Sequence, residues 1–170
     1  MLGFDIPASW YQSLNAIFIV LLAPVFAWLW IRLGPHQPSL PIKFALGLFG
    51  VAAGFVWLAV GAELASAGEK VSPNWLVITY LLHTIGELCL SHVGLSAMTK
   101  LAPARVAGMM MGVWFLGSSV GNFIGGRMAG FYESMPLERL FLMVSLFGIV
   151  SGAVMVVIAK PVKRLMSGVR

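Results

Sequence analysis

Charged side chains are scarce in this sequence. Of its 170 residues, only 10% are Asp, Glu, Lys or Arg, whereas 59% are hydrophobic. A soluble globular domain carries roughly a quarter charged residues, so the deficit excludes that class of protein. The apolar residues form continuous runs rather than an alternating pattern, which favours helices over a closed barrel as the way to satisfy the backbone in lipid. The composition therefore predicts an all-α integral membrane protein.

Cysteine is nearly absent as well. The one cysteine, Cys89, excludes an intrachain disulfide and a cysteine metal cluster. His83 and Glu87 lie four residues apart, but without an HExxH pattern or a further ligand they are weak evidence for a metal site. The sequence also shows no pair of a nucleophile and a base. We therefore expect no enzyme, no metal and no other cofactor.

Five apolar runs are long enough to cross a bilayer, which requires about 20 residues of helix. The first run has no basic region before it that would mark a cleavable signal peptide. Prolines and glycines separate the runs and forbid a continuous helix there. The sequence predicts five transmembrane helices and no soluble domain, with spans at about residues 14–31, 43–64, 75–98, 106–128 and 140–159.

The net charge of +5 could indicate an acidic or nucleic-acid partner, but the positive charges follow the expected membrane topology. Eight of the eleven Lys and Arg residues lie on one side of the five spans: Arg32, Lys43, Lys100, Arg105, Lys160, Lys163, Arg164 and Arg170. Positive side chains accumulate in cytoplasmic loops. We therefore expect a cytoplasmic C-terminus, an external N-terminus, a lipid bilayer as partner and no nucleic acid. A chain that begins outside also suggests that further helices precede it.

Glu87 lies near the middle of the third span. A carboxylate at that depth costs about 2.5–3.5 kcal/mol on insertion scales, so something must offset the cost. One reading is an acid that is protonated or hydrogen-bonded to a neighbouring helix. The favoured reading is a cation or proton site, because ionisable groups inside membranes are usually functional. Ser91 lies one turn further along the same stripe, and it could simply bond its own backbone.

The fourth span carries Gly117, Gly121 and Gly125 at four-residue spacing. Such ladders of small residues let helices approach closely, so we expect these glycines to pack against another helix. Trp114 precedes them and could be an interfacial anchor or a pocket wall. Asn15, near the outer end of the first span, would by itself be explained by interface polarity.

Four segments of the sequence resemble one transporter family over nearly the whole chain. They read WYQSLNAIFIVLLAPVFAWLW, KFALGLFGVAAGF, WLVITYLLHTIGELCLSHVGLS with TKLAP, and GMMMGVWFLGSSVGNFIGG. They are similar to the C-terminal part of the proton-dependent oligopeptide transporters, a branch of the major facilitator superfamily. The resemblance implies a fold of twelve core helices in two halves with a substrate cavity between them, in which the five spans would be helices eight to twelve.

The resemblance also implies roles for particular residues. Glu87 matches an acid that faces the amino terminus of the peptide, and Ser91 matches a neighbouring cavity residue. Asn15 matches an asparagine that contacts substrate, and Trp114 matches a cavity tryptophan. The implied function is that of a proton-coupled di- and tripeptide symporter in a bacterial inner membrane, with the proton as coupling ion and a periplasmic start to this chain.

The sequence departs from the family pattern at two prolines. The family usually has SPVG where this chain has Ser91-His92-Val93-Gly94, and SLNP where it has Ser13-Leu14-Asn15-Ala16. Each replacement removes a proline and hence the cause of a helix kink. His92 adds a titratable group near the expected site, so Glu87 and His92 are both candidates for a link to protons.

The first half of the family's fold has no counterpart in these residues. The proton-coupling ExxER-type motif is missing from the sequence, as are the helices that would form the opposite wall of the cavity. We therefore expect the chain to act with an N-terminal half. The alternative is a transport-inactive fragment, or an assembly partner that needs a separate N-terminal half.

Overall fold

The computed structural model describes residues 8–103, 105–132 and 134–165, without the side chains of residues 8–9, 91–93, 97, 99–101 and 165. Within these ranges it contains five long helices and a single 3-10 turn. They are α1 (Ala8–Leu33), η1 (Gly34–His36), α2 (Leu40–Ser66), α3 (Asn74–Leu101), α4 (Ala107–Ala129) and α5 (Leu137–Leu165).

Each of the five helices is long and apolar enough to cross a membrane. The shortest, α4, has 23 residues and the longest, α5, has 29, which at 1.5 Å per residue is about 35–44 Å, more than the hydrocarbon core of about 30 Å. The five spans expected from the sequence lie inside these helices, apart from Val106, which is the N-cap residue of α4. The fold is all-α, as the composition predicts.

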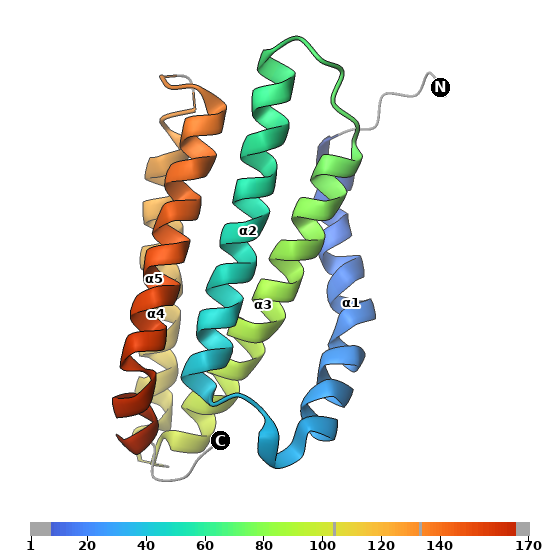
Figure 1. Cartoon of the computed structure of the whole chain (residues 1–170). Helices are drawn as coiled ribbons and strands as arrows, with labels where there is room; N and C mark the ends of the chain where they lie inside the picture. The colour runs from blue at the N-terminus through green and yellow to red at the C-terminus, as the bar shows by residue number, and fades with distance from the viewer. Residues whose placement is uncertain (1–7, 104, 133, 166–170) are drawn as a thin grey trace.

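Short connections reverse the chain between successive helices. Gly34 and Gly68 have positive φ angles, +47° and +86°, in a region that favours glycine because it has no Cβ. Pro73 is the N-cap residue of α3, where its missing N–H removes no hydrogen bond from the helix interior. α1 begins and α5 ends at opposite ends of the bundle, as an odd number of crossings requires (Figure 1).

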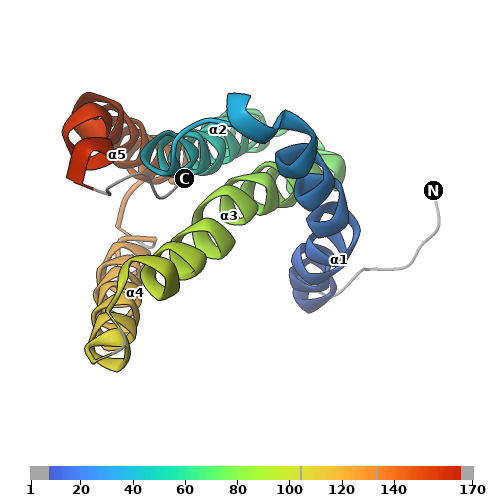
Figure 2. The same ribbon diagram turned by 90° about the horizontal axis from the view of Figure 1, so that it is seen from below.

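The helices are arranged around α2 and α3. α2 packs against α3 on one side and against α5 on the other, whereas α1 and α4 have their main contacts with α3. Seen along the bundle, α1 and α4 flank α3 on the side away from α2 (Figure 2). α3 is therefore the helix through which the other parts of the described structure are connected.

Glycine makes the seam between α2 and α3 very close. Gly47, Gly54 and Gly61 follow each other at seven-residue intervals on α2, and all three are buried. A Cβ added to Gly47 would lie 2.7 Å from the carbonyl oxygen of Gly86 on α3, and one added to Gly61 would lie 3.0 Å from the Trp75 ring. Small residues of this kind are what allow membrane helices to approach backbone to backbone.

A second stripe of small residues on α2 faces α5. Ala45, Ala52 and Ala59 are buried, also at seven-residue intervals. A Cβ added to Gly148 of α5 would lie 3.1 Å from the Cβ of Ala52, and the buried hydroxyl of Ser145 donates a hydrogen bond of 3.0 Å to the Ala52 carbonyl. α2 is thus a packing helix held on two faces.

The glycine ladder of α4 is arranged differently. Gly117, Gly121 and Gly125 are exposed, and an added Cβ would meet nothing within 4 Å at any of them. Their predicted packing partner is therefore not a described helix of this chain. That these glycines pack against a helix stays a prediction, and the partner helix would lie outside the described residues.

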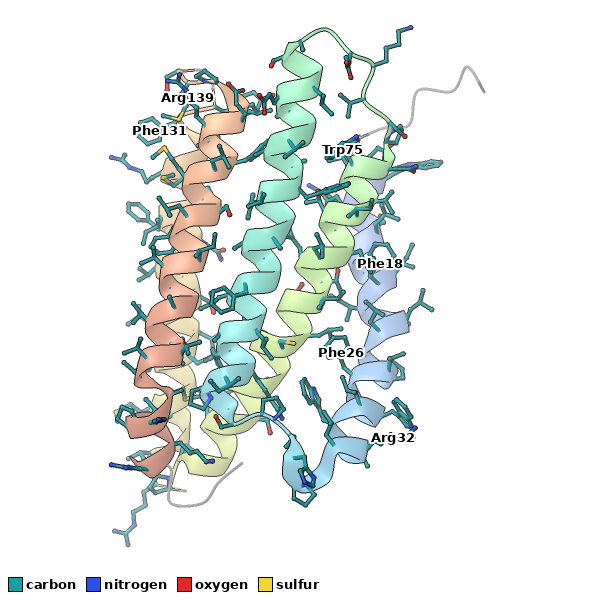
Figure 3. The ribbon with its side chains drawn as sticks, in the orientation of Figure 1. Phe18, Phe26, Arg32, Trp75, Phe131 and Arg139 are labelled. Carbon is teal, nitrogen blue, oxygen red and sulfur yellow. The ribbon has the colours of Figure 1, made fainter. Side chains whose placement is uncertain are left out.

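Cations and tryptophans meet at the end of the bundle where α1 turns into α2. The Arg32 guanidinium carbon lies 4.9 Å from the centre of the Trp28 ring, and the Lys43 Nζ lies 4.4 Å from that of Trp30. Arg32 and Arg139 stand at opposite ends of the bundle (Figure 3). Charges at the ends and apolar side chains between them are typical of membrane-spanning helices.

Replacing Gly86 with alanine should destabilise the chain. The new Cβ would lie 2.6 Å from the Gly47 carbonyl oxygen, and overpacking of this kind costs about 1–3 kcal/mol. The measurement is the free energy of unfolding of the purified chain in detergent micelles. Gly117→Ala is the matched control, because it adds the same methyl group to an open helix face and should be neutral or stabilising. Equal effects of the two substitutions would contradict the close α2–α3 seam.

Candidate functional site

Glu87 lies at the middle of α3 and faces α1. Its side chain is half-buried, and its Oε2 accepts a hydrogen bond of 3.2 Å from Nδ2 of Asn15. The two residues are 72 positions apart in the chain, so the contact exists only because α1 packs on α3. Both readings of Glu87, the satisfied buried acid and the ligand site, are compatible with this bond.

Thr84 completes the polar contact between the two helices. Its Oγ1 lies 2.6 Å from Oδ1 of Asn15 and 2.7 Å from the carbonyl oxygen of Tyr80, and the side chain is 0% exposed. Sequence reasoning missed this residue. Its position three residues before Glu87 places it on the same helix face, and that spacing is the signal that could have identified it.

His83 turns away from Glu87 although it is one helical turn away. Its ring packs against Phe55 of α2, with centroids 4.6 Å apart, and it fills the space beside Gly54. His83 and Glu87 therefore face different helices and cannot share a ligand in this arrangement. Among the described residues, no group of three His, Cys, Asp or Glu side chains could hold a metal ion.

Trp114 connects α4 to α3. Its ring occupies the notch left by Gly94, where an added Cβ would collide with the indole. It also meets the Phe44 ring of α2 edge to face, with centroids 6.2 Å apart at 88°. Gly94 lies seven residues beyond Glu87, so the indole packs about two helical turns from the carboxylate along α3.

The structure thus brings Asn15 of α1 and Glu87 of α3 together. It places the ring of Trp114, from α4, against Gly94 further along α3. Ser91 and His92 lie between Glu87 and Gly94 in the sequence of α3, but their side chains are outside the described part of the structure. The roles assigned to them from the sequence stay predictions.

The arrangement suits a small cation or a proton. A carboxylate has about four lone-pair positions, and among the described residues Asn15 is the side chain that donates to Glu87. A partly exposed acid of this kind can accept an ammonium group, which forms charge-assisted hydrogen bonds. It can also accept a proton.

Comparison with known proteins identifies relatives over the whole fold. The model of the POT family matches residues 1–148. The peptide transporter YePEPT of Yersinia enterocolitica is 45% identical over 98% of this chain and 34% of its own length. Dipeptide and tripeptide permease A of Escherichia coli is 35% identical over 97% of this chain and 35% of its own length.

Solved structures give the same result. A peptide transporter crystallised with sulfate superposes with a TM-score of 0.89 at 42% identity, covering 99% of this chain and 34% of that one. A mutant of such a transporter in complex with alafosfalin gives a TM-score of 0.88 at 42% identity, with the same coverage. This chain spans about a third of the length of these relatives. It is a multi-pass membrane protein of their fold.

The notch at Gly94 should be coupled energetically to Trp114. Gly94→Ala should lower the free energy of unfolding by about 1–3 kcal/mol, because the new methyl group collides with the indole. In a chain that already carries Trp114→Ala, the same substitution should lower the free energy of unfolding by less. The new methyl group then no longer meets the indole, although it still lies close to the ring of Phe44. A double-mutant cycle in detergent measures the difference, for which contacting residues give about 0.5–3 kcal/mol. An identical loss of stability in both backgrounds would contradict the contact between the Trp114 indole and Gly94.

Proposed function

Because this chain belongs to the POT family, we propose that it is the C-terminal portion of a proton-coupled symporter of di- and tripeptides. The carboxylate of Glu87 carries the proposal, as the acid at the middle of a membrane-length helix that is held toward α1 by Asn15. A peptide has one ammonium terminus, and Glu87 binds it. The relatives named as peptide transporters support this substrate class.

Asn15 holds the Glu87 carboxylate in place and also contacts the peptide. Ser91 and Trp114 line the same cavity. The proton is the coupling ion, taken up by Glu87 with His92 as a second candidate, and no other cofactor takes part. This chain forms one wall of the cavity, and the N-terminal half of the transporter supplies the other. The coverage of about a third of each relative supports the need for that half. The alternative is a transport-inactive fragment, or an assembly partner that needs a separate N-terminal half.

The membrane is the inner membrane of a bacterium, with α1 beginning on the periplasmic side and α5 ending on the cytoplasmic side. The distribution of Lys and Arg supports this orientation. Arg32 and Lys43 stand at the end where α1 turns into α2, and Lys160, Lys163 and Arg164 stand at the end of α5. Both places lie at the same end of the bundle (Figure 1).

Transport can be tested with a chimera. The chain replaces the matching third of the Yersinia peptide transporter, to which it is 45% identical. We expect dipeptide uptake driven by an inward proton gradient. Glu87→Gln should lower it about tenfold or more, because a hydrogen bond to a charged group contributes about 1.5–3 kcal/mol and 1.4 kcal/mol is a factor of ten.

The matched control for this substitution is Glu69→Gln, which neutralises an exposed carboxylate in the loop before α3. It should leave uptake unchanged. A chimera that reaches the membrane but transports nothing would favour the alternative of a transport-inactive fragment. Undiminished uptake by Glu87→Gln would show that Glu87 does not bind the peptide.

Orientation can be tested by labelling cysteines in intact cells with a membrane-impermeant maleimide. Glu69→Cys, in the loop between α2 and α3, should react from outside. His36→Cys, in the exposed turn after α1, should react only after the membrane is opened. The native Cys89 is buried and serves as the internal background. The reverse labelling pattern would invert the proposed topology.

A further inference from the structure

The hydroxyl of Thr84 has one proton and two neighbouring oxygen atoms that could receive it. Its Oγ1 lies 2.6 Å from Oδ1 of Asn15 and 2.7 Å from the carbonyl oxygen of Tyr80. A threonine hydroxyl has a single donor and two acceptor lone pairs. Thr84 can therefore donate fully to only one of these oxygens at a time. Because its side chain is 0% exposed, the choice is made among protein groups.

The amide of Asn15 allows either choice. Its oxygen and its NH₂ group are nearly equal in size, so a half-turn of the amide exchanges acceptor and donor with little change in packing. With NH₂ toward Glu87, Asn15 donates 3.2 Å to Oε2 and Oδ1 accepts from Thr84. An ionised carboxylate can only accept, so it requires this arrangement. A protonated acid can also accept here through its carbonyl oxygen, but its own O–H is then not used by Asn15.

The second arrangement pairs the same groups with the donors reversed. Thr84 donates to the Tyr80 carbonyl and accepts from the NH₂ of Asn15. The amide oxygen of Asn15 then faces Glu87, which must supply a proton to it. The protonated carboxylic acid does so, since it has one O–H donor. In each of the two arrangements, the Thr84 hydroxyl proton and one N–H of Asn15 have an acceptor.

We propose that Thr84 is a positioning residue for Glu87, and that the chain of Glu87, Asn15 and Thr84 switches between these two hydrogen-bond arrangements when Glu87 gains or loses its proton. Thr84 is the fixed end of this chain, because the backbone of α3 holds it beside the Tyr80 carbonyl. Asn15 is the part that turns, and it belongs to α1. Protonation of Glu87 on α3 thereby changes the orientation of a side chain on α1.

The switch has a consequence for the proposed ligand. A cation beside Glu87, such as a peptide ammonium, favours the carboxylate and hence the arrangement with NH₂ toward Glu87. A proton favours the other arrangement. Cation and proton would therefore select opposite orientations of Asn15. This consequence rests on the proposed function. The switch itself involves only Glu87, Asn15, Thr84 and the Tyr80 carbonyl, and so it does not depend on a ligand.

Among the described residues, the hydrogen bonds of this network join Glu87, Asn15, Thr84 and the backbone carbonyl of Tyr80. Among the described residues, the side chain that hydrogen-bonds Glu87 is that of Asn15. The remaining titratable side chains of the four helices are Tyr11 and Arg32 on α1, Lys43 and Glu63 on α2, Tyr80, His83 and Cys89 on α3, and Arg127 on α4. α3 also carries His92 and Lys100, whose side chains lie outside the description.

The test is nuclear magnetic resonance of the whole chain in micelles with labelled asparagine side chains. In samples in which Glu87 is ionised, the Asn15 amide protons should show Overhauser contacts to the Glu87 methylene groups. In samples in which Glu87 is protonated, these contacts should be lost and replaced by contacts to the β-proton of Thr84. The infrared band of the protonated carboxyl, identified by its loss in Glu87→Gln, reports the protonation state in the same samples.

Three variants separate positioning from simple packing. Thr84→Ser keeps the hydroxyl and should keep the switch. Thr84→Val removes the hydroxyl that accepts from the Asn15 NH₂ group in the second arrangement, so the amide should lose its single orientation when Glu87 is protonated and keep it when Glu87 is ionised. Thr79→Val is the matched control, because the buried Thr79 also bonds its own helix, 2.8 Å from the Trp75 carbonyl, whereas the side-chain hydrogen bonds of Asn15 are with Glu87 and Thr84. It should switch as the unchanged chain does.

The proposal is overturned if the Asn15 amide keeps the same neighbours in both protonation states of Glu87, or if Thr84→Val behaves like Thr79→Val. It is also overturned if the carboxyl band changes while the amide does not turn. None of these readouts measures transport. A failed switch therefore leaves the uptake of peptides by the chimera as a separate result, and failed uptake leaves the switch intact.

Discussion

The close approach of Gly47 on α2 to Gly86 on α3 is the contact on which the remaining structure depends. Without a hydrophobic driving force between helices in lipid, association relies on close packing and hydrogen bonds. A Cβ on Gly86 would lie 2.6 Å from the Gly47 carbonyl oxygen, so larger side chains would separate the two helices. Glu87 follows Gly86 directly. The residue that sets the helix spacing therefore also sets the direction in which the acid points.

The two outer helices reach α3 by different interactions. α1 is joined to it by a polar contact, in which Asn15 meets both Glu87 and Thr84. α4 is joined by an aromatic contact, in which Trp114 fills the notch at Gly94. Polar groups that are satisfied within a membrane specify a partner more strictly than apolar packing does. We infer that α1 is the more precisely placed of the two, and that its placement responds to changes at Glu87.

Much of α4 is turned away from the rest of the described chain. Its glycine ladder meets no atom within 4 Å of an added Cβ, and large side chains such as Phe115 and Phe123 are exposed. The chain spans about a third of the length of its relatives, so such a face agrees with the proposal that the chain works with a further half. The prediction of glycine packing at this ladder came from spacing alone, and spacing does not tell which helix is the partner.

The sequence by itself determined the class of fold and the five helices, because a charge deficit and apolar runs of membrane length leave few alternatives. It also marked Glu87, since an acid in an apolar run is recognisable without any coordinates. Asn15 had no distinctive signal of its own and was connected to Glu87 only through family resemblance. The tertiary structure decided the contacts: Asn15 and Glu87 are 72 positions apart, and Thr84 becomes informative only when α1 is seen against it. Which glycines pack was decided in the same way, because a glycine at Gly47 and one at Gly117 look alike in sequence and differ only in what lies opposite.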